Sequence, residues 1–398
     1  MNSDLFVTDC GVITPLGRGK GAIAGALFGG SKAGIAPRAD LIPGRAVDVG
    51  AVREPLAALP TALSAYDSRN NRLMQVALAE IVPSIEDAKS RYGRDRIAVI
   101  LGTSTSGIGD GEDALMAYRR NGAWPRSFDY RLQETGGLAE FAARSLDLTG
   151  PAYSVATACS SSAKVFASAR RLIRAGLADA AVVGGADTLC RMTLNGFASL
   201  EALSKSRCNP FSANRDGITI GEGAAAFLLD RIPGSVRLLG LGENSDAHHA
   251  TAPDPEGRGA GLAMRQALED AGLAPSAIAY VNLHGTATPL NDAMEAKAIA
   301  DLFGAQMPCS STKAMTGHML GAAGGCEAAF LWLTLNPETN PQSLLPPHLW
   351  DGVQDAALPA LNLVAAGTRF SRSQPTAMLS NSFGFGGSNM ALILGTAA

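Results

Sequence analysis

The sequence predicts an α/β protein, because short apolar runs rich in β-branched residues alternate with alanine-rich segments of helical spacing. The strand-like runs are 96–101, 180–183, 224–229, 278–283 and 391–394. The helical segments are 163–175, 259–271 and 293–302. With 398 residues, 46% of them hydrophobic, the chain is long enough to bury a large core. We therefore expect buried sheets that are covered by helices.

Composition excludes several classes of function. The net charge is −3 and no long run of Lys or Arg occurs, so we expect no nucleic-acid partner. The six cysteines have no spacing typical of zinc ligands. Residues 1–4 lack the basic start of a signal peptide, and the apolar stretch 319–335 contains Glu327 and glycines. That stretch predicts a buried helix and no membrane span, and the expected location is the cytoplasm.

Two segments of the chain repeat one pattern, in which a strand-like run leads through small hydroxyl residues into a helix rich in small residues. They are Thr157–Ser162 and Ser310–Met315. The repetition suggests two related α/β halves that meet near Pro233, with a boundary between residues 1–232 and 233–398.

The segment Tyr153–Cys159 predicts a strand that ends at Cys159, and a helical segment that opens with three serines follows it directly. A thiol at this junction lies on free backbone N–H groups and the positive end of the helix dipole, which favour the thiolate over a thiol of ordinary pKa. Small neighbours would let an acyl group approach the sulfur. Most buried cysteines are inert packing residues, and this segment alone leaves both interpretations open.

Two of the five histidines lie in glycine-rich turns after strands. They are His284, in Val281–Pro289, and His318, in Ser311–Gly324. Turns at strand ends commonly carry the chemistry of α/β proteins. A single histidine in such a turn is more often structural, but two in matching contexts beside a thiol favour catalysis.

Five segments share patterns that occur together in one family. They are Thr157–Ser162, Asn209–Gly223, His284–Pro289, Lys313–Gly324 and Asn381–Asn389. In family order, and across nearly the whole chain, they resemble the β-ketoacyl-acyl carrier protein synthases of the elongating Cys-His-His type. The resemblance implies a thiolase fold, in which two similar halves stack as five αβαβα layers, usually in a homodimer.

The resemblance also implies a mechanism. An acyl group would pass from a phosphopantetheine thioester to Cys159, with the backbone N–H groups of Cys159 and Phe385 as the oxyanion hole. Malonyl-acyl carrier protein would then lose carbon dioxide, His284 and His318 would stabilise the enolate, and the carbanion would attack the thioester. We expect no metal and no cofactor, because the substrates arrive on the carrier protein.

Further roles follow from matched family positions. Lys313 and Glu327 would support the histidines electrostatically, although a purely structural ion pair is the alternative. Thr286 and Thr288 would hydrogen-bond the pantetheine arm. Phe383, at the start of a glycine-rich run, would belong to a mobile gate at the acyl pocket.

The carrier proteins of this pathway are acidic, so their docking site should be basic. Arg69 and Arg72 match docking positions, and Arg207 is a third candidate. Thr105 falls where the family shapes the acyl pocket, and would replace a larger aliphatic gate. Together with Ile218 and Asn291, this departure leaves open whether the substrate belongs to ordinary fatty-acid elongation or to a specialised polyene or polyketide pathway.

Three other interpretations of these motifs can be compared with the sequence. A thiolase needs a second cysteine near the C-terminus, which is absent, and initiating synthases carry Asn where this chain has His318. A non-catalytic chain-length-type subunit lacks the nucleophile that Cys159 supplies. A catalytic subunit in a heterodimer with such an inactive partner stays open as an alternative.

Overall fold

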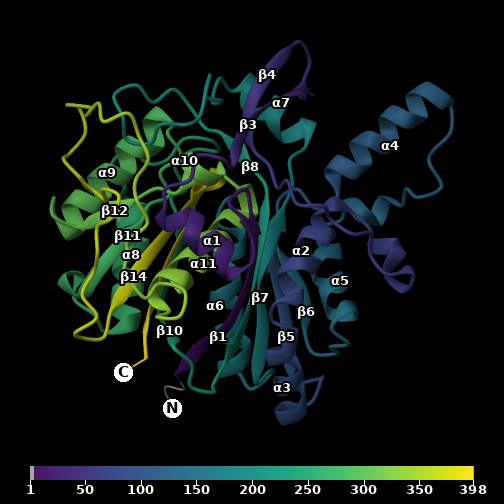
Figure 1. Ribbon diagram of the computed structural model, residues 1–398, viewed down its shortest axis with the longest axis horizontal. Helices are drawn as coiled ribbons and strands as arrows, with labels where there is room; N and C mark the ends of the chain where they lie inside the picture. The colour runs from purple at the N-terminus through teal and green to yellow at the C-terminus, as the bar shows by residue number, and fades with distance from the viewer. Residues whose placement is uncertain (1–3, 398) are drawn as a thin grey trace.

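The computed structural model describes residues 4–397; residues 1–3, which carry part of the argument against a signal peptide, lie outside this range. Within it, the chain forms a twelve-stranded sheet and a three-stranded sheet (Figure 1). The first half of the large sheet contains β1 (Leu5–Thr14), β2 (Gly17–Arg18), β5 (Ile97–Gly102), β6 (Ala152–Val155), β7 (Ala180–Asp187) and β9 (Gly223–Asp230). The second half contains β10 (Val236–Ser245), β11 (Ile278–Asn282), β12 (Pro308–Ser310), β13 (Asn362–Leu363), β14 (Ala377–Gly384) and β15 (Ser388–Thr396). The small sheet is β3 (Ile35–Ile42), β4 (Arg45–Gly50) and β8 (Ile220–Gly221).

The large sheet repeats one order of strands. From one edge to the centre it runs β6-β5-β7-β9-β1, and from the other edge, after β13, it runs β12-β11-β14-β15-β10. Corresponding neighbours have the same orientation: the outer pairs are parallel and the inner pairs antiparallel. The halves join where Leu5 and Phe6 of β1 pair with β10. We keep the boundary between residues 232 and 233 as a proposal, which this order supports.

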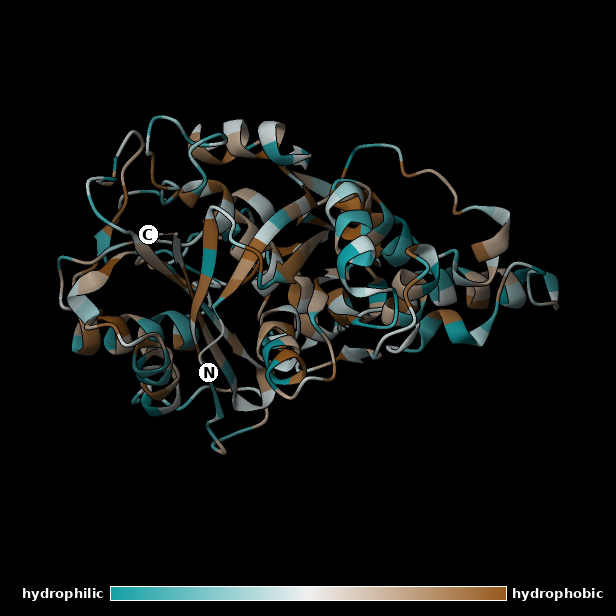
Figure 2. Cartoon of the chain, turned by 90° about the horizontal axis from the view of Figure 1, so that it is seen from below, coloured by the Kyte–Doolittle hydropathy of each residue, from teal (hydrophilic) through white to brown (hydrophobic). Residues whose placement is uncertain are grey.

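Helices form three layers around the two halves of the sheet. The helices of the described chain are α1 (Lys20–Phe28), α2 (Arg69–Ala79), α3 (Val82–Tyr92), α4 (Ile108–Asn121), α5 (Gly137–Ser145), α6 (Ser161–Arg174), α7 (Arg191–Ser199), α8 (Arg258–Ala271), α9 (Pro289–Phe303), α10 (Lys313–Thr316) and α11 (Ala323–Leu335). Helices α2 and α5 share a core with the first half, and α8 and α9 share one with the second. Helices α6 and α11 lie between the halves in a third core. The predicted α/β class and five layers are confirmed, and Figure 2 shows hydrophobic residues concentrated on the strands and inner helices.

Helix α11 is the centre of the molecule. All of its residues are buried, because it contacts strands of both halves as well as α6. A helix that is apolar on every side suits such a position, and this explains the apolar run in the sequence. No helix formed by residues 4–397 has the length and apolar character needed to cross a membrane.

Close backbone contact between β5 and α6 positions the start of α6, and it generates a prediction about stability. A Cβ added at Gly102 would lie 2.4 Å from the backbone N of Ser162. We expect Gly102→Ala to lower the free energy of unfolding by roughly 1–3 kcal/mol, as overpacking does. Gly25→Ala, in α1 with no atom within 4 Å of the added Cβ, should instead raise it by about 0.5–1 kcal/mol. Urea denaturation of both variants checks this, and equal effects would contradict it.

Candidate active site

Cys159 lies in a tight turn between β6 and α6. The strand ends at Val155, so the expectation that it runs to the cysteine is wrong. Ala158 has a φ of 51°, which breaks the extended backbone. The Ser161 hydroxyl accepts the Thr157 N–H (2.9 Å) and donates to the carbonyl oxygen of Ala158 (2.6 Å). The turn places the thiol directly before the first turn of α6.

The resting form of this sulfur differs from the expectation. Cys159 is buried, and burial raises the pKa of its thiol to about 11, against the opposing charge of Lys313 and a hydrogen bond from the Phe385 backbone. Loss of solvation therefore outweighs the groups that favour the thiolate. The thiol is protonated near neutral pH, and a nearby base must take its proton when it reacts.

His284 follows β11 in a turn that a buried carboxylate holds. Glu295 of α9 accepts the backbone N–H groups of His284 (2.8 Å) and Gly285 (2.7 Å), and the Asn381 amide donates to the same carboxylate (3.1 Å). One turn earlier on α9, Asp292 accepts the N–H of Ala287 at 3.1 Å. We did not identify these two acids from the sequence. The sequence feature that could have revealed them is a pair of carboxylates, three residues apart, in the helix that follows a histidine-containing turn.

His318 is held by backbone contacts to the small sheet and by a second buried acid. Its N–H donates to the carbonyl oxygen of Thr219 (2.7 Å), and its own carbonyl oxygen accepts the N–H of Gly221 (2.9 Å). Three residues later, the N–H of Gly321 donates to Asp187 at 2.6 Å. Asp187 thereby fixes the turn that carries His318, and it too was missed from the sequence.

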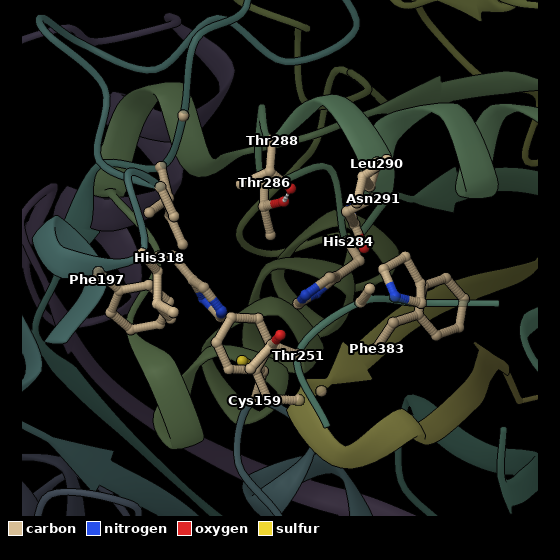
Figure 3. Close-up of a pocket in the computed structure, with 18 of the residues that line it drawn as sticks. Cys159, Phe197, Thr251, His284, Thr286, Thr288, Leu290, Asn291, His318 and Phe383 are labelled. Atoms are coloured by element: carbon tan, nitrogen blue, oxygen red, sulfur yellow. Dashed lines mark hydrogen bonds between the residues drawn. The ribbon is translucent and has the colours of Figure 1, made fainter. Parts of the chain in front are cut away.

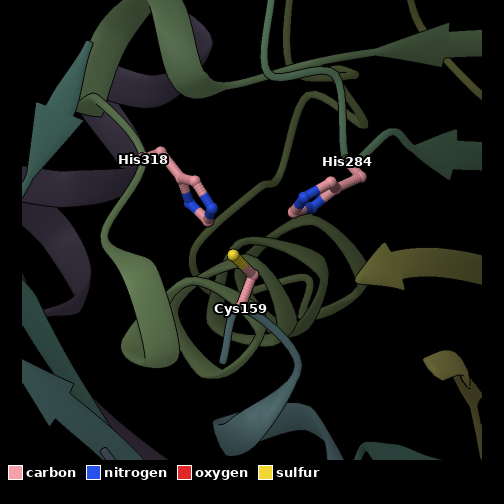
Figure 4. A group of neighbouring side chains, drawn as sticks. All are labelled: Cys159, His284 and His318. Carbon is pink, nitrogen blue, oxygen red and sulfur yellow. The ribbon is translucent and has the colours of Figure 1, made fainter. Parts of the chain in front are cut away.

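The three predicted catalytic side chains meet in space. The Cys159 sulfur and one nitrogen of each of His284 and His318 lie within 4.8 Å of one another, and the rings are nearly perpendicular with centroids 5.2 Å apart. Figure 4 shows the sulfur pointing between the imidazoles. Burial lowers the pKa of both histidines well below the usual value, and the charge of Lys313 adds to this effect. Both rings are therefore neutral near pH 7.

Three of these imidazole nitrogens are buried and have no hydrogen-bond partner in the described protein. Among residues 4–397, neither nitrogen of His318 has a hydrogen-bond partner, and Nδ1 of His284 has none. Unpaired buried polar atoms are costly unless a ligand satisfies them. A sulfur and two imidazole nitrogens at this spacing are also a donor set that zinc accepts. The expectation that no metal is needed therefore stays a prediction.

Lys313 and Glu327 form an ion pair beneath this group. Both side chains are 1% exposed, and the ammonium donates to Oε1 of Glu327. Burial raises the pKa of Glu327, and Lys313 opposes this shift. The pair places a positive charge that acts on Cys159 and both histidines. This arrangement supports the predicted electrostatic role.

A cavity of about 310 Å³ leads to the group (Figure 3). Thr286, Thr288 and Phe383 line it, as we expect for substrate-binding residues, and the two threonine hydroxyls hydrogen-bond each other at 2.9 Å. Thr105 is not among the lining residues, because its hydroxyl lies 2.9 Å from Asp187, to which it donates. In this conformation Thr105 supports the end of β5 and does not line the cavity, so its predicted place in the acyl pocket has no support here.

Aromatic rings surround the cavity at the predicted gate. Phe383 packs edge-on against His284, with ring centroids 5.9 Å apart. The Phe385 side chain is 40% exposed, and its ring packs against that of Phe197 in α7 with the ring centroids 5.4 Å apart. Gly386 and Gly387 follow with φ values of 79° and 73°, which glycine adopts without strain. A side chain held by one ring contact and followed by two glycines suits a gating role.

The candidate docking arginines differ in their environments. Arg69 donates to the buried carboxylate of Glu222, with its closest contact at 2.5 Å, and Arg72 pairs with Asp67 at 2.6 Å. The ion pairs of Arg69 and Arg72 therefore hold α2 against its neighbouring segments. Arg207 is half-buried and has no ion-pair partner among residues 4–397. The docking roles of all three stay predictions.

Fold and site together define a class of protein: a thiol enzyme of the thiolase fold, with two neutral histidines and a buried lysine at its nucleophile. The chain matches the models for the β-ketoacyl synthase N-terminal domain over residues 54–233 and C-terminal domain over residues 236–345. It is 33% identical to 3-oxoacyl-[acyl-carrier-protein] synthase 2 of Staphylococcus aureus over 355 residues, which cover 82% of this chain and 84% of that protein. The chain belongs to the β-ketoacyl synthase family.

Two solved structures are similar over essentially the whole chain. One contains the ketosynthase ApeO in complex with its chain length factor ApeC, from Xenorhabdus doucetiae. A chain of it is 46% identical, with a TM-score of 0.93 and coverage of 99% of this chain and 98% of that chain. The other, the ishigamide ketosynthase/chain length factor, is 27% identical with a TM-score of 0.88 and full coverage of both chains.

The raised thiol pKa predicts how Cys159 reacts with pH. With a pKa of about 11, roughly one thiol in a thousand is ionised at pH 8, so alkylation by iodoacetamide should accelerate about tenfold per pH unit between pH 7 and 10. Peptide mass spectrometry at Cys159 measures this rate, with Cys159→Ala as the blank. A plateau below pH 9 would show instead that the helix dipole and Lys313 dominate.

Proposed function

We propose that this chain catalyses the decarboxylative condensation of malonyl-acyl carrier protein with an acyl group on Cys159, giving a 3-oxoacyl-acyl carrier protein two carbons longer. The observation that carries this proposal is the meeting of one thiol and two neutral imidazoles at the end of a cavity, beside a buried lysine. The active-site roles that follow belong to the same proposal.

The first half-reaction loads the enzyme. A neutral imidazole accepts the thiol proton as the sulfur of Cys159 attacks the thioester, and the backbone N–H groups of Cys159 and Phe385 receive the developing oxyanion. The Phe385 backbone already hydrogen-bonds toward the sulfur, which supports this assignment. The pantetheine sulfur leaves, takes up the proton and departs with its carrier protein.

The second half-reaction makes the carbon–carbon bond. Malonyl thioester loses its carboxylate as carbon dioxide, and the electron pair forms an enolate whose oxygen accepts hydrogen bonds from His284 and His318. Neutral imidazoles can each donate one N–H, and the nearby charge of Lys313 adds to the stabilisation. The carbanion attacks the Cys159 thioester and expels the sulfur. Because the thiol proton left with the carrier protein in the first half-reaction, the Cys159 thiolate takes up one proton from solvent and returns to its resting state.

Substrates on a carrier protein account for the remaining features of the cavity. Thr286 and Thr288 present hydroxyls to a pantetheine arm, and Phe383 and Phe385 gate the acyl pocket. An acidic carrier protein would dock on basic residues, of which Arg207 is the best placed because the described residues give it no ion pair. No cofactor of the enzyme's own is part of this proposal, and the cytoplasm is the proposed location.

A second subunit of the same fold fits the edge of the sheet at β6. This strand is the last of its half, and Tyr153 on it is 39% exposed. Free edges tend to pair with another chain. Nearby, α4 and the loop after it project from the body (Figure 1) and carry a stack of three rings, Tyr118, Trp124 and Phe128. The two similar structures described above each include a chain length factor, which supports a heterodimer with such a partner as an alternative to a homodimer.

The proposed reaction predicts different defects for different residues. Cys159→Ala should abolish acylation of the protein and condensation. His284→Ala and His318→Ala should each lower malonyl decarboxylation by about 10²–10³-fold, because each removes one donor to the enolate. The measurement is mass spectrometry of the protein and products after incubation with acyl- and malonyl-carrier proteins.

A matched control is Cys190→Ala, which removes another buried thiol that does not line the cavity. It should leave acylation and condensation intact. Acyl adducts that persist on Cys159→Ala would overturn the assignment of the nucleophile.

The proposed interface generates a separate prediction. Tyr153→Asp places a charge at the free edge of β6, so it should reduce the fraction of chain in a dimer, with itself or with a chain-length-type partner, by at least about tenfold. Ile232→Asp is the control, since Ile232 is also exposed but follows the central strand β9. Sedimentation velocity reports both, and unchanged association of Tyr153→Asp would place the interface elsewhere.

A further inference from the structure

His348 lies behind the active site in the segment that follows α11, where it is buried and does not line the cavity. Its Nδ1 accepts the backbone N–H of Ser311 at 3.1 Å. Because Nδ1 accepts, the proton of the neutral ring is on Nε2, which donates to the carbonyl oxygen of Pro210 at 3.0 Å. Its ring also contacts Phe211 and Trp350, each with centroids 6.0 Å away. The imidazole is therefore fixed in position and in tautomer.

Ser311 connects this ring to two catalytic positions. Its hydroxyl donates to the carbonyl oxygen of Gly285 at 2.7 Å, directly after His284 in the chain. The hydroxyl oxygen of Ser311 also accepts the backbone N–H of Lys313 at 3.3 Å. Moving Ser311 would disturb both the turn that carries His284 and the start of the helix that carries Lys313.

Packing gives a second connection between His348 and the His284 turn. A Cβ added at Gly285 would lie 2.6 Å from Cβ of Ser311 and 2.8 Å from Cε2 of Phe211. Ser311 and Phe211 are two of the residues that His348 contacts. Phe211 also donates its N–H to Asp292 at 2.7 Å, and Asp292 holds the far side of the turn. The turn that carries His284 therefore packs against Ser311 and Phe211, and both of these residues contact His348.

We propose that His348 is a positioning residue for the condensation half-reaction: through Ser311 it sets His284 and Lys313 for malonyl decarboxylation. The inference rests on the proposed function, and it separates the two half-reactions. Cys159 is carried by the turn between β6 and α6, and no hydrogen bond of residues 4–397 links that turn to His348 or Ser311. Lys313 acts on Cys159 only through its charge, so loading of Cys159 should be less sensitive to His348 than malonyl decarboxylation is.

Two substitutions separate the two hydrogen bonds of the His348 ring, the one from Ser311 and the one to Pro210. In His348→Asn the amide oxygen lies near the former Nδ1 and can accept from Ser311, whereas in His348→Gln the amide nitrogen lies near the former Nε2 and can donate to Pro210. Both lose the ring contacts with Phe211 and Trp350. We expect His348→Gln to lower kcat for malonyl decarboxylation roughly tenfold, with KM unchanged, through loss of the Ser311 hydrogen bond. His348→Asn should stay within about threefold of the wild type.

The partial reactions decide the outcome. Acylation of Cys159, followed by mass spectrometry, should lose less than decarboxylation in His348→Gln and stay near the wild-type rate in His348→Asn, and thermal melting checks the folding of both variants. Equal loss of decarboxylation in both, or a parallel loss of acylation, would overturn the positioning role. If His348→Gln does not fold, Ser311→Ala replaces it, and a larger loss of decarboxylation than of acylation is again expected. A wild-type protein that neither acylates nor decarboxylates would instead overturn the proposed function itself.

Discussion

The buried ion pair of Lys313 and Glu327 is the interaction on which the rest of the site depends. Removing two charges from water is costly, so each needs the other, and neither can be lost alone without leaving a buried charge. Glu327 projects from α11, which is buried only because both halves of the sheet enclose it. The five-layer architecture thus provides the dry environment in which one ammonium group acts on Cys159, His284 and His318 at once.

Three other buried carboxylates are also paired inside the protein, and their partners are backbone N–H groups of the active-site turns. Glu295 holds the His284 turn, Asp292 holds the residues just after it, and Asp187 holds the turn after His318. Each accepts backbone N–H groups that would otherwise be unpaired inside the protein. The turns they hold contain unfavourable conformations, with φ of 66° at Ala287 and 50° at Leu320. Carboxylate hydrogen bonds therefore stabilise the strained loops that orient the histidines.

The sequence was informative where local pattern determines structure, and less so where distant segments meet. The runs that became β5, β7 and β9 are buried on both faces, so their hydrophobicity alone revealed them. The role of Asp187 depends on a contact with Gly321, 134 positions away, that no local pattern encodes. The hydrogen bond from the Thr105 hydroxyl to Asp187 joins residues 82 positions apart and was equally invisible in the sequence, and the predicted role of Thr105 in the acyl pocket stays a prediction. The thiol pKa was misjudged because burial is a property of the whole fold.

Burial of the thiol and neutrality of the histidines have one physical cause, and together they make the two half-reactions compatible. A permanent thiolate would repel the malonyl carboxylate and the enolate formed from it, whereas a protonated or acylated sulfur does not. In the proposed mechanism, charged imidazoles would protonate the carbanion, whereas neutral ones would donate hydrogen bonds to its oxygen and keep it nucleophilic. Desolvation of Cys159, His284 and His318 would therefore favour both half-reactions of that mechanism.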